Sequence, residues 1–399
     1  MLKGKTVVLA VTGSIAAYKI ANLARMLVKL GADVHVLMTK NATNFINPIT
    51  FETLVKHKCL IDTFDRNFEY SVEHVALAKT ADVVMIAPAS ANVIGKIANG
   101  IADDMLTTTV MACPCKKIVS PAMNHNMFHN PIVQDNIEKL RKYGYEIVEP
   151  ATGMLANGDM GDGRMPEESL LLEYILKEIA YEKDLKGKKI LVTAGATAED
   201  IDPVRYITNH SSGKMGFALA KNAMLRGGDV TLVMAECTAI PPEFVNIIKV
   251  RTAKEMFDAV INISDDMDII VKAAAVADYR PKNISSEKVK KKDGEMVIEL
   301  ERTDDILKTI GENKKDGQFI CGFSMETENM LENSRAKLKK KNVDMIVANN
   351  LKQDGAGFGT DTNIVTLITS DDELELEIMS KDEVAKKIFD FILEKTDKS

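Results

Sequence analysis

The sequence predicts an α/β protein with two doubly wound, Rossmann-like domains. The chain has 399 residues, more than the roughly 250 to 300 at which a single hydrophobic core stops growing. In each half, short apolar runs alternate with segments of helical spacing, as in parallel sheets with crossover helices. Residues 181–189 are charged, lack an apolar stripe and show no core residues, which is typical of a linker. We therefore expect domains at residues 1–180 and 190–399.

Composition narrows the class of protein. Hydrophobic residues make up 46% and charged residues 27% of the chain, and the net charge of -7 gives no electrostatic reason to bind nucleic acid or an anionic membrane. No apolar run reaches the roughly 18 residues of a membrane span, and residues 1–5 lead into a strand without a signal-peptide core. We expect a cytoplasmic protein. The five cysteines are scattered and odd in number, which argues against a disulfide framework.

The first domain opens with a βαβ unit. Residues 6–12 form a continuous apolar run, residues 15–30 have helical spacing, and residues 33–38 are again strand-like. The intervening turn begins Gly13-Ser14-Ile15 and lacks the Gly-x-Gly-x-x-Gly fingerprint of dinucleotide sites. A mononucleotide is therefore favoured over NAD.

A further strand, residues 83–87, ends in Pro88-Ala89-Ser90-Ala91-Asn92, and Ala102-Asp103-Asp104 follows downstream. Ligands of open α/β sheets bind beyond the carboxyl ends of the strands, so these small and polar residues are expected at a ligand site.

Two other segments of this domain carry candidate side chains. Asn124 and Met127 lie in Pro121-Ala122-Met123-Asn124-His125-Asn126-Met127, where the amide offers two donors suited to a carboxylate and the thioether offers soft apolar surface. His74 precedes the strand at 83, and a single histidine is more often structural or solvated than functional. The glycine-rich residues 153–164 suit a flexible surface loop.

The second domain begins with a strand at Ile190 that runs into Gly, Thr and Ser residues as far as Gly216, followed by a helix over residues 217–226. A parallel strand feeds a phosphate-cradling loop in this way. Asp278 follows the strand at residues 269–272, at a ligand-binding edge. Lys288 lies in a lysine-rich run that is ordinarily a solvated loop.

Taken together, these strings resemble the flavin decarboxylase and phosphopantothenate–cysteine ligase that are fused in coenzyme A biosynthesis, from Lys5 to about Asp371. The resemblance implies an N-terminal flavodoxin-like flavoprotein domain and a C-terminal nucleotide-binding ligase domain. It implies FMN as cofactor, with contacts from Gly13, Ser14, Ile15, Thr39, Ser90, Asn92, Ala102 and Asp103.

In the decarboxylase half, the resemblance makes His74 the acid–base residue, Asn124 the carboxylate anchor and Met127 a substrate contact. Asn157 stands where the family has a cysteine that protonates the reduced intermediate. A carboxamide has no proton to donate near neutral pH, whereas a thiol with a pKa of about 8.5 has one. We expect either an impaired reductive step or another donor.

In the ligase half, the resemblance makes Asn209 and Lys288 catalytic and places Mg²⁺ or Mn²⁺ at Asp278. Lys337 and Lys341 are expected at positions i and i+4 of one helix, so both ammonium groups can reach one triphosphate. The implied substrate contacts are Met127, Asn209, Asp278, Lys288, Asp304, Asp305, Ile306, Leu307, Phe323, Lys337 and Lys341.

By the family's scheme, 4'-phosphopantothenate attacks the α-phosphate of CTP, and cysteine displaces CMP from the acyl-cytidylate. FMN-dependent decarboxylation then gives 4'-phosphopantetheine. The resemblance also implies a homo-oligomer, a dodecamer of decarboxylase trimers with paired ligase domains. Two alternatives stay open: a peptidyl-cysteine-type decarboxylase that stops at the enethiol, which the missing cysteine would suit, and a flavin-binding regulatory protein.

Overall fold

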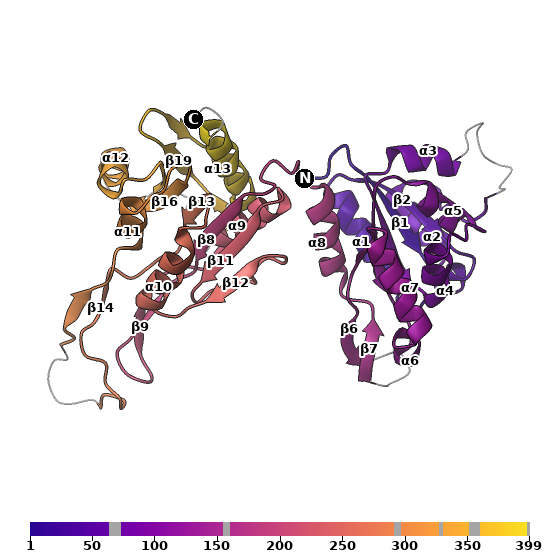
Figure 1. The fold of residues 1–399 in the computed structure, drawn as a ribbon, viewed down its shortest axis with the longest axis horizontal. Helices are drawn as coiled ribbons and strands as arrows, with labels where there is room; N and C mark the ends of the chain where they lie inside the picture. Colours follow the sequence, from indigo (N-terminus) through magenta and orange to yellow (C-terminus); the bar gives the residue numbers. More distant parts are fainter. Residues whose placement is uncertain (64–72, 155–159, 291–296, 327–329, 351–359, 397–399) are drawn as a thin grey trace. The chain divides into compact units, whose positions relative to one another are not determined.

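The computed structural model describes residues 1–63, 73–154, 160–290, 297–326, 330–350 and 360–396. The chain divides into two compact units, Met1–Glu182 and Lys183–Ser399 (Figure 1). Within the described ranges, no helix has the length and apolar character needed to cross a bilayer.

Unit 1 contains a five-stranded parallel sheet in the order β2-β1-β3-β4-β5. Its strands are β1 (Thr6–Val11), β2 (Asp33–Met38), β3 (Val83–Ala89), β4 (Lys116–Pro121) and β5 (Glu146–Ile147). This is the strand order of flavodoxin-like folds, in which successive strands are added on one side of β1 and then on the other, so that the order reverses between β1 and β3. The predicted flavodoxin-like domain is confirmed.

Helices cover both faces of this sheet. One group consists of α1 (Ala17–Lys29), α2 (Pro48–Val55) and α8 (Glu168–Ile179), and the other of α3 (Glu73–Thr80), α4 (Ala91–Ala98), α5 (Met105–Ala112) and α7 (Pro131–Lys142). Val8 and Ala10 of β1 pack with the second group. Because side chains alternate along a strand, the other β1 residues face the first group.

Three short elements complete unit 1: η1 (Ala42–Asn44), α6 (His125–Phe128) and the antiparallel hairpin of β6 (Ala151–Met154) with β7 (Met160–Arg164). Helix α1 begins two residues later than predicted. Ala17 N donates to Ser14 O at 3.0 Å, so residues 14–16 form a turn before the helix.

Unit 2 contains an eight-stranded sheet in the order β12-β11-β8-β13-β16-β17-β19-β20. The first six strands are parallel and have the order of dinucleotide-binding folds. Strand β19 pairs antiparallel with β17, and β20 pairs antiparallel with β19. Their bounds are β8 (Lys189–Ala194), β11 (Asp229–Met234), β12 (Asn246–Lys249), β13 (Ile269–Lys272), β16 (Phe319–Glu326), β17 (Met345–Asn350), β19 (Val365–Ile368) and β20 (Glu373–Glu375). The second doubly wound domain is thus confirmed.

The helices of unit 2 also form two groups. Helices α9 (Lys214–Leu225) and α13 (Lys381–Thr396) pack together, and α10 (Ala253–Ser264), α11 (Ile306–Glu312) and α12 (Met330–Lys341) share one core. Gly216 lets α9 approach β8 closely, because a Cβ there would lie 2.5 Å from the Ala194 Cβ. The short antiparallel pairs are β9 (Ala198–Asp200) with β10 (Tyr206–Thr208), β14 (Tyr279–Pro281) with β15 (Leu300–Arg302), and β18 (Thr362–Asn363) with β21 (Met379–Ser380).

The expected linker is not free of packing. Leu185 is fully buried, and Asp184 forms an ion pair with the buried Arg226 at 2.5 Å. Lys183 Nζ donates to the Leu225 carbonyl at 2.7 Å. The prediction that residues 181–189 carry no core residues is therefore wrong from Lys183 onwards, where the chain already belongs to unit 2.

Candidate functional sites

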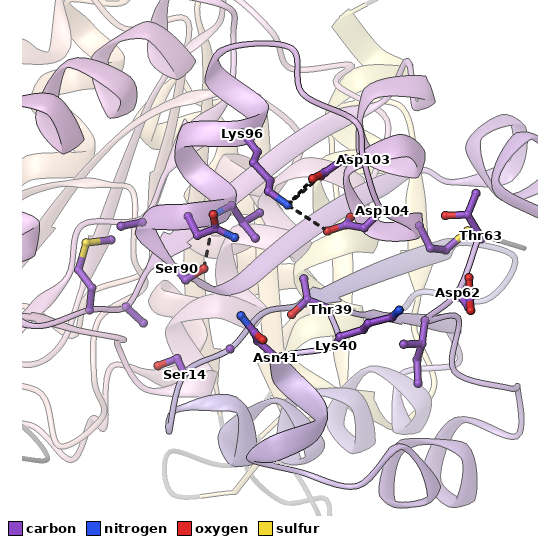
Figure 2. Close-up of a pocket in the computed structure, with 18 of the residues that line it drawn as sticks. Ser14, Thr39, Lys40, Asn41, Asp62, Thr63, Ser90, Lys96, Asp103 and Asp104 are labelled. Atoms are coloured by element: carbon purple, nitrogen blue, oxygen red, sulfur yellow. Dashed lines mark hydrogen bonds and ion pairs between the residues drawn. The ribbon is translucent and has the colours of Figure 1, made fainter.

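A cavity of about 650 Å³ opens in unit 1 where β1, β2, β3 and β4 end (Figure 2). Its volume lies within the range of small-molecule sites in proteins. Six of the eight predicted flavin contacts line it: Gly13, Ser14, Thr39, Ser90, Asn92 and Asp103. The other two, Ile15 and Ala102, do not line it, and both are exposed, Ile15 to 57%.

Hydrogen bonds hold the ends of β1 and β3 together beneath this cavity. Ser90 N donates to Thr12 Oγ1 at 2.9 Å, and Thr12 Oγ1 donates to the Pro88 carbonyl at 2.6 Å. Ser90 is also the N-cap of α4, where its Oγ accepts a hydrogen bond from Val93 N at 3.5 Å. The first turn of α4 lines the cavity, and the N-terminus of a helix favours a phosphate group.

Charges at the cavity are largely neutralised. Lys96 Nζ lies 2.7 Å from Asp103 Oδ1 and 3.7 Å from Asp104 Oδ2 (Figure 2). The hydrogen bond to Asp103 raises the pKa of Lys96, and the same contact lowers the pKa of Asp103. Because the ammonium offsets these carboxylates, they repel an anionic ligand less.

The remaining lining suits a flat aromatic ring and was partly missed from the sequence. Thioether side chains come from Met105, Met123 and Met127, and such groups make favourable contacts with aromatic rings. Several lining residues that the sequence did not single out follow strand β2 or lie beside it: Lys40, Asn41, Ile61, Asp62 and Thr63. The hydroxyl groups, helix N-terminus and thioethers together fit FMN.

Asn124 is the N-cap of α6, and its Oδ1 accepts a hydrogen bond from Asn126 N at 2.9 Å. Among the described residues, its two amide hydrogens have no partner. Met127 lies on the same short helix and reaches the cavity. Asn124 therefore keeps two donors for a carboxylate close to the cavity.

The β6–β7 hairpin docks on this segment. Met123 N donates to the Gly163 carbonyl at 3.1 Å, and Asp162 N donates to His125 Nδ1 at 3.2 Å. Gly163 has φ +112°, and a Cβ there would lie 2.5 Å from Met123 O. The close approach therefore requires glycine. Asn157 lies outside the described residues, and so does the side chain of His74, whose backbone belongs to the start of α3.

A second cavity, of about 500 Å³, lies in unit 2 at the carboxyl ends of β8 and β11. Asn209 lines it and donates from Nδ2 to the Ala275 carbonyl at 3.3 Å. Polar lining also comes from Thr208, Ser211, Glu236, Thr238 and Lys249. Of the predicted ligase residues, the structure places only Asn209 in this cavity.

Of the other predicted ligase residues, Asp278, Asp305, Lys337 and Lys341 lie around Lys272 at the ends of β13 and β16, a lysine that the sequence reading missed. Lys272 ends β13, and burial lowers its pKa to about 8, assisted by Lys337 and Lys341. The charges of Asp305 and Asp278 raise this pKa. The position of Lys272 at the end of a central strand is the feature of the sequence that could have indicated it.

Lys337 and Lys341 both lie on α12, as predicted. Lys337 Nζ donates to the Phe323 carbonyl at 3.0 Å, and Lys341 forms an ion pair with Asp305, the N-cap of α11. The ammonium groups of Lys272, Lys337 and Lys341 thus lie close together and outnumber the two nearby carboxylates, an arrangement that favours binding of a polyanion.

The remaining residues of this set differ in exposure. Asp278, Lys288 and Asp304 are exposed. Ile306 and Leu307 are 2% and 3% exposed and belong to the hydrophobic core. Their side chains are not available to a ligand, so the predicted substrate contacts there could come only from the backbone.

A flavodoxin-ordered unit with a flavin-sized cavity, joined to a dinucleotide-ordered unit with clustered lysines, defines a fused flavoprotein and nucleotide-binding protein. Residues 1–180 match the Flavoprotein family, and residues 185–396 match the DNA/pantothenate metabolism flavoprotein C-terminal domain. The chain belongs to the family of coenzyme A biosynthesis bifunctional proteins CoaBC.

Relatives in this family match along nearly their whole length. The Bacillus subtilis (strain 168) protein is 46% identical over 392 residues, covering 97% of this chain and 96% of the relative. The Borreliella burgdorferi protein is 43% identical over 390 residues, covering 97% and 99%. A crystal structure of the C-terminal domain of a CoaBC protein is 44% identical and covers 54% of this chain and 98% of that one, with a TM-score of 0.46.

Proposed function

We propose that this chain catalyses two consecutive steps of coenzyme A biosynthesis, the ligation of 4'-phosphopantothenate with cysteine and the decarboxylation of the product to 4'-phosphopantetheine. The observation that carries this proposal is that proteins named as bifunctional in this pathway match 97% of the chain, which includes both halves. The flavin-sized cavity and the lysine cluster supply one site for each step.

In the decarboxylase half, FMN would be held by the cavity residues Gly13, Ser14, Thr39, Ser90, Asn92 and Asp103. Bound FMN would supply reversible two-electron oxidation of the substrate's thiol-bearing carbon. The amide of Asn124 would orient the substrate carboxylate, and Met127 would cover its apolar part. His74 would accept and return a proton at the thiol.

In the ligase half, CTP would lie against the lysine cluster. Lys288, Lys337 and Lys341 would offset the charge of the triphosphate, and Asn209 would bind the acyl intermediate by neutral hydrogen bonds. Asp278 offers one exposed carboxylate, which is enough for a Mg²⁺ or Mn²⁺ ion held mainly by phosphate oxygens and water.

The purified chain tests the ligase step directly. With 4'-phosphopantothenate, cysteine, CTP and Mg²⁺, it should release pyrophosphate and form phosphopantothenoylcysteine. Lys288→Gln should suppress this release, because a neutral amide cannot offset triphosphate charge, whereas Lys290→Gln is the matched control in the same lysine run. Equal loss of pyrophosphate release in both variants would contradict the role assigned to Lys288. A preference for ATP over CTP would contradict the assigned nucleotide.

A second candidate concerns where decarboxylation stops. Asn157 replaces the family's proton-donating cysteine, which favours release of an enethiol instead of the saturated thiol. A relative that is 43% identical over 354 residues, covering 87% of this chain and 99% of the relative, is named a cysteine/cysteine sulfinic acid decarboxylase. Mass spectrometry of products from phosphopantothenoylcysteine, and from cysteine or cysteine sulfinate alone, distinguishes these activities.

We further propose a cytoplasmic homo-oligomer in which decarboxylase trimers are joined by ligase dimers into a dodecamer. Neither unit is expected to bind nucleic acid or membranes, because the net charge is -7. Light scattering of the purified chain tests the assembly, which should have twelve times the mass of one chain. A mass that is a multiple of neither a dimer nor a trimer would exclude it.

A further inference from the structure

Asp33, the first residue of β2, lies between two histidines. Its Oδ1 is 2.7 Å from His57 Nε2, and its Oδ2 is 3.1 Å from His35 Nε2. The two imidazole rings stack with centroids 4.2 Å apart and an angle of 21° between their planes. One ligand atom from each of the three residues lies within 4.8 Å of the other two. Three potential metal ligands therefore converge at one edge of the first sheet.

The backbone holds these three residues in place. Asp33 and His35 are two residues apart on an edge strand, so they share one face of the sheet. Helix α2 ends at Val55, and its C-cap Lys56 has a φ of 64°, which is uncommon for a lysine and turns the chain back towards β2. Leu60 N then donates to Val36 O, and Met38 N donates to Leu60 O, both at 3.0 Å. His57 is thus fixed next to β2 by main-chain contacts.

We propose that Asp33, His35 and His57 form a binding site for a divalent transition-metal ion, with Zn²⁺ as the first choice and water in the fourth position. Two imidazole nitrogens and one carboxylate suit Zn²⁺ better than Mg²⁺ or Ca²⁺, which prefer oxygen ligands. In a tetrahedral site with bonds of about 2.0 to 2.2 Å, ligand atoms lie about 3.3 to 3.6 Å apart. One ligand atom from each residue already lies within 4.8 Å of the other two, so side-chain rotation can bring them to this spacing.

The ion can enter from solvent, because the side chains of Asp33 and His57 are 51% and 41% exposed. Each imidazole Nε2 must give up its hydrogen bond with Asp33 to bind the ion, so the ion replaces the present histidine–carboxylate contacts.

The site lies at the start of one wall of the flavin-sized cavity. His57 is followed by Leu60, which pairs with β2, and then by Ile61, Asp62 and Thr63, which line the cavity. An ion that joins His57 to Asp33 would therefore anchor this wall to the edge of the sheet. The site is separate from the residues proposed to contact FMN, so it does not depend on the proposed function.

Zn²⁺ titration of the metal-free full-length chain against a chromophoric chelator tests the proposal. The double variant His35→Gln/His57→Gln should lose one equivalent of bound Zn²⁺. The matched control His125→Gln/His129→Gln removes two histidines from the other histidine–aspartate cluster and should keep that equivalent. Asp33→Asn should weaken binding at least about tenfold, because even the loss of an outer-shell partner costs that much. An unchanged equivalent in His35→Gln/His57→Gln would overturn the proposal.

Hydrogen exchange gives a second readout and shows whether the variants remain folded. Zn²⁺ should slow exchange of the Leu60 and Met38 amides in the wild-type chain, because their hydrogen bonds join the segment after His57 to β2. The His35→Gln/His57→Gln chain should show no such change. Equal protection in both chains, or in neither, would also reject the site.

Discussion

Asp202 accepts a hydrogen bond from the backbone N–H of Val289 at 3.1 Å, across 87 positions of sequence. Asp202 is buried and also binds Arg205, whose NH2 group donates to the Val289 carbonyl at 2.9 Å. Both polar groups of the Val289 backbone are therefore held by one ion pair. This contact fixes the segment that carries the adjacent Lys288.

Asp202→Asn should raise the KM for the nucleotide roughly tenfold, since hydrogen bonds to charged groups contribute about 1.5 to 3 kcal/mol and the amide cannot accept from every present donor. The decarboxylase rate should not change. Steady-state pyrophosphate release at varied CTP measures the effect, with Asp258→Asn as control because Asp258 pairs with Lys254 on the surface of α10. An unchanged KM would show that Lys288 does not depend on this clamp.

The Asp202 contact also predicts a pH dependence of stability. The Arg205 guanidinium holds the pKa of Asp202 well below its usual range. A carboxyl with a lowered pKa in the folded state stabilises the fold above its unfolded pKa of about 3.9, and this stabilisation is lost as the pH falls further. The difference in unfolding free energy between wild type and Asp202→Asn should therefore shrink below about pH 4.

Lys272 leads to a prediction about stability at alkaline pH. Its pKa of about 8 lies below the unfolded value near 10.5, so between these values the unfolded chain binds more protons and stability should rise with pH. The effect is at most about 3 kcal/mol. Urea denaturation at several pH values should show this rise in wild type and its loss in Lys272→Met. Saturating CTP with Mg²⁺ should also reduce it, since a bound polyphosphate keeps the lysine charged.

These lysines show what the sequence could and could not supply. Apolar runs predicted β1, β2 and β13 to within a residue or two, because buried parallel strands are continuous in sequence. Spacing alone placed Lys337 and Lys341 on one helix. It could not reveal that Lys272 joins them, because that meeting depends on the pairing of β13 with β16. Likewise Leu185 was hidden by charged neighbours, and only the tertiary fold buries it.

The boundary correction leads to a test with two fragments. A fragment of residues 181–399 keeps Leu185 and the Asp184–Arg226 ion pair, whereas residues 186–399 lose both. Burial of one leucine contributes roughly 1.5 to 3 kcal/mol, and of its two ion-pair partners among the described residues Arg226 would keep Asp390. We expect the shorter fragment to unfold at a lower urea concentration, because its free energy of unfolding should be smaller by about 2 kcal/mol or more. Leu185→Ala in the longer fragment should reproduce part of this loss, and equal stability of both fragments would contradict the revised boundary.

Gly13 tests the flavin cavity without removing a polar contact. A Cβ at Gly13 would lie 2.7 Å from the Asn41 Cβ, so Gly13→Ala should push apart two loops that line the cavity. We expect the purified variant to lose most of its bound flavin, measured by absorbance after denaturation. Gly95→Ala is the control, since a Cβ there meets nothing closer than 3.7 Å and lies within α4. Full flavin content in Gly13→Ala would show that the loops adjust.

The final prediction concerns Asn157, the position where this chain departs from its family's chemistry. Loss of a proton donor to the reduced carbon should spare thiol oxidation and decarboxylation, which come earlier, and slow formation of the saturated thiol. CO₂ should then exceed 4'-phosphopantetheine in a single turnover, and Asn157→Cys should restore equal amounts. Mass spectrometry of the thiol products measures the ratio.

Other cysteines are poorly placed to replace the missing donor. Cys113 and Cys115 precede β4, whereas the cavity lies beyond its carboxyl end, about 20 Å away at 3.3 Å per residue. Cys59 is buried, its Sγ donates to the Pro48 carbonyl at 3.5 Å, and burial raises its pKa to about 12. Among the described residues, no cysteine lines the cavity. Complete conversion to 4'-phosphopantetheine by the chain with Cys59, Cys113 and Cys115 all changed to Ser would therefore show that this reaction needs no thiol donor from unit 1.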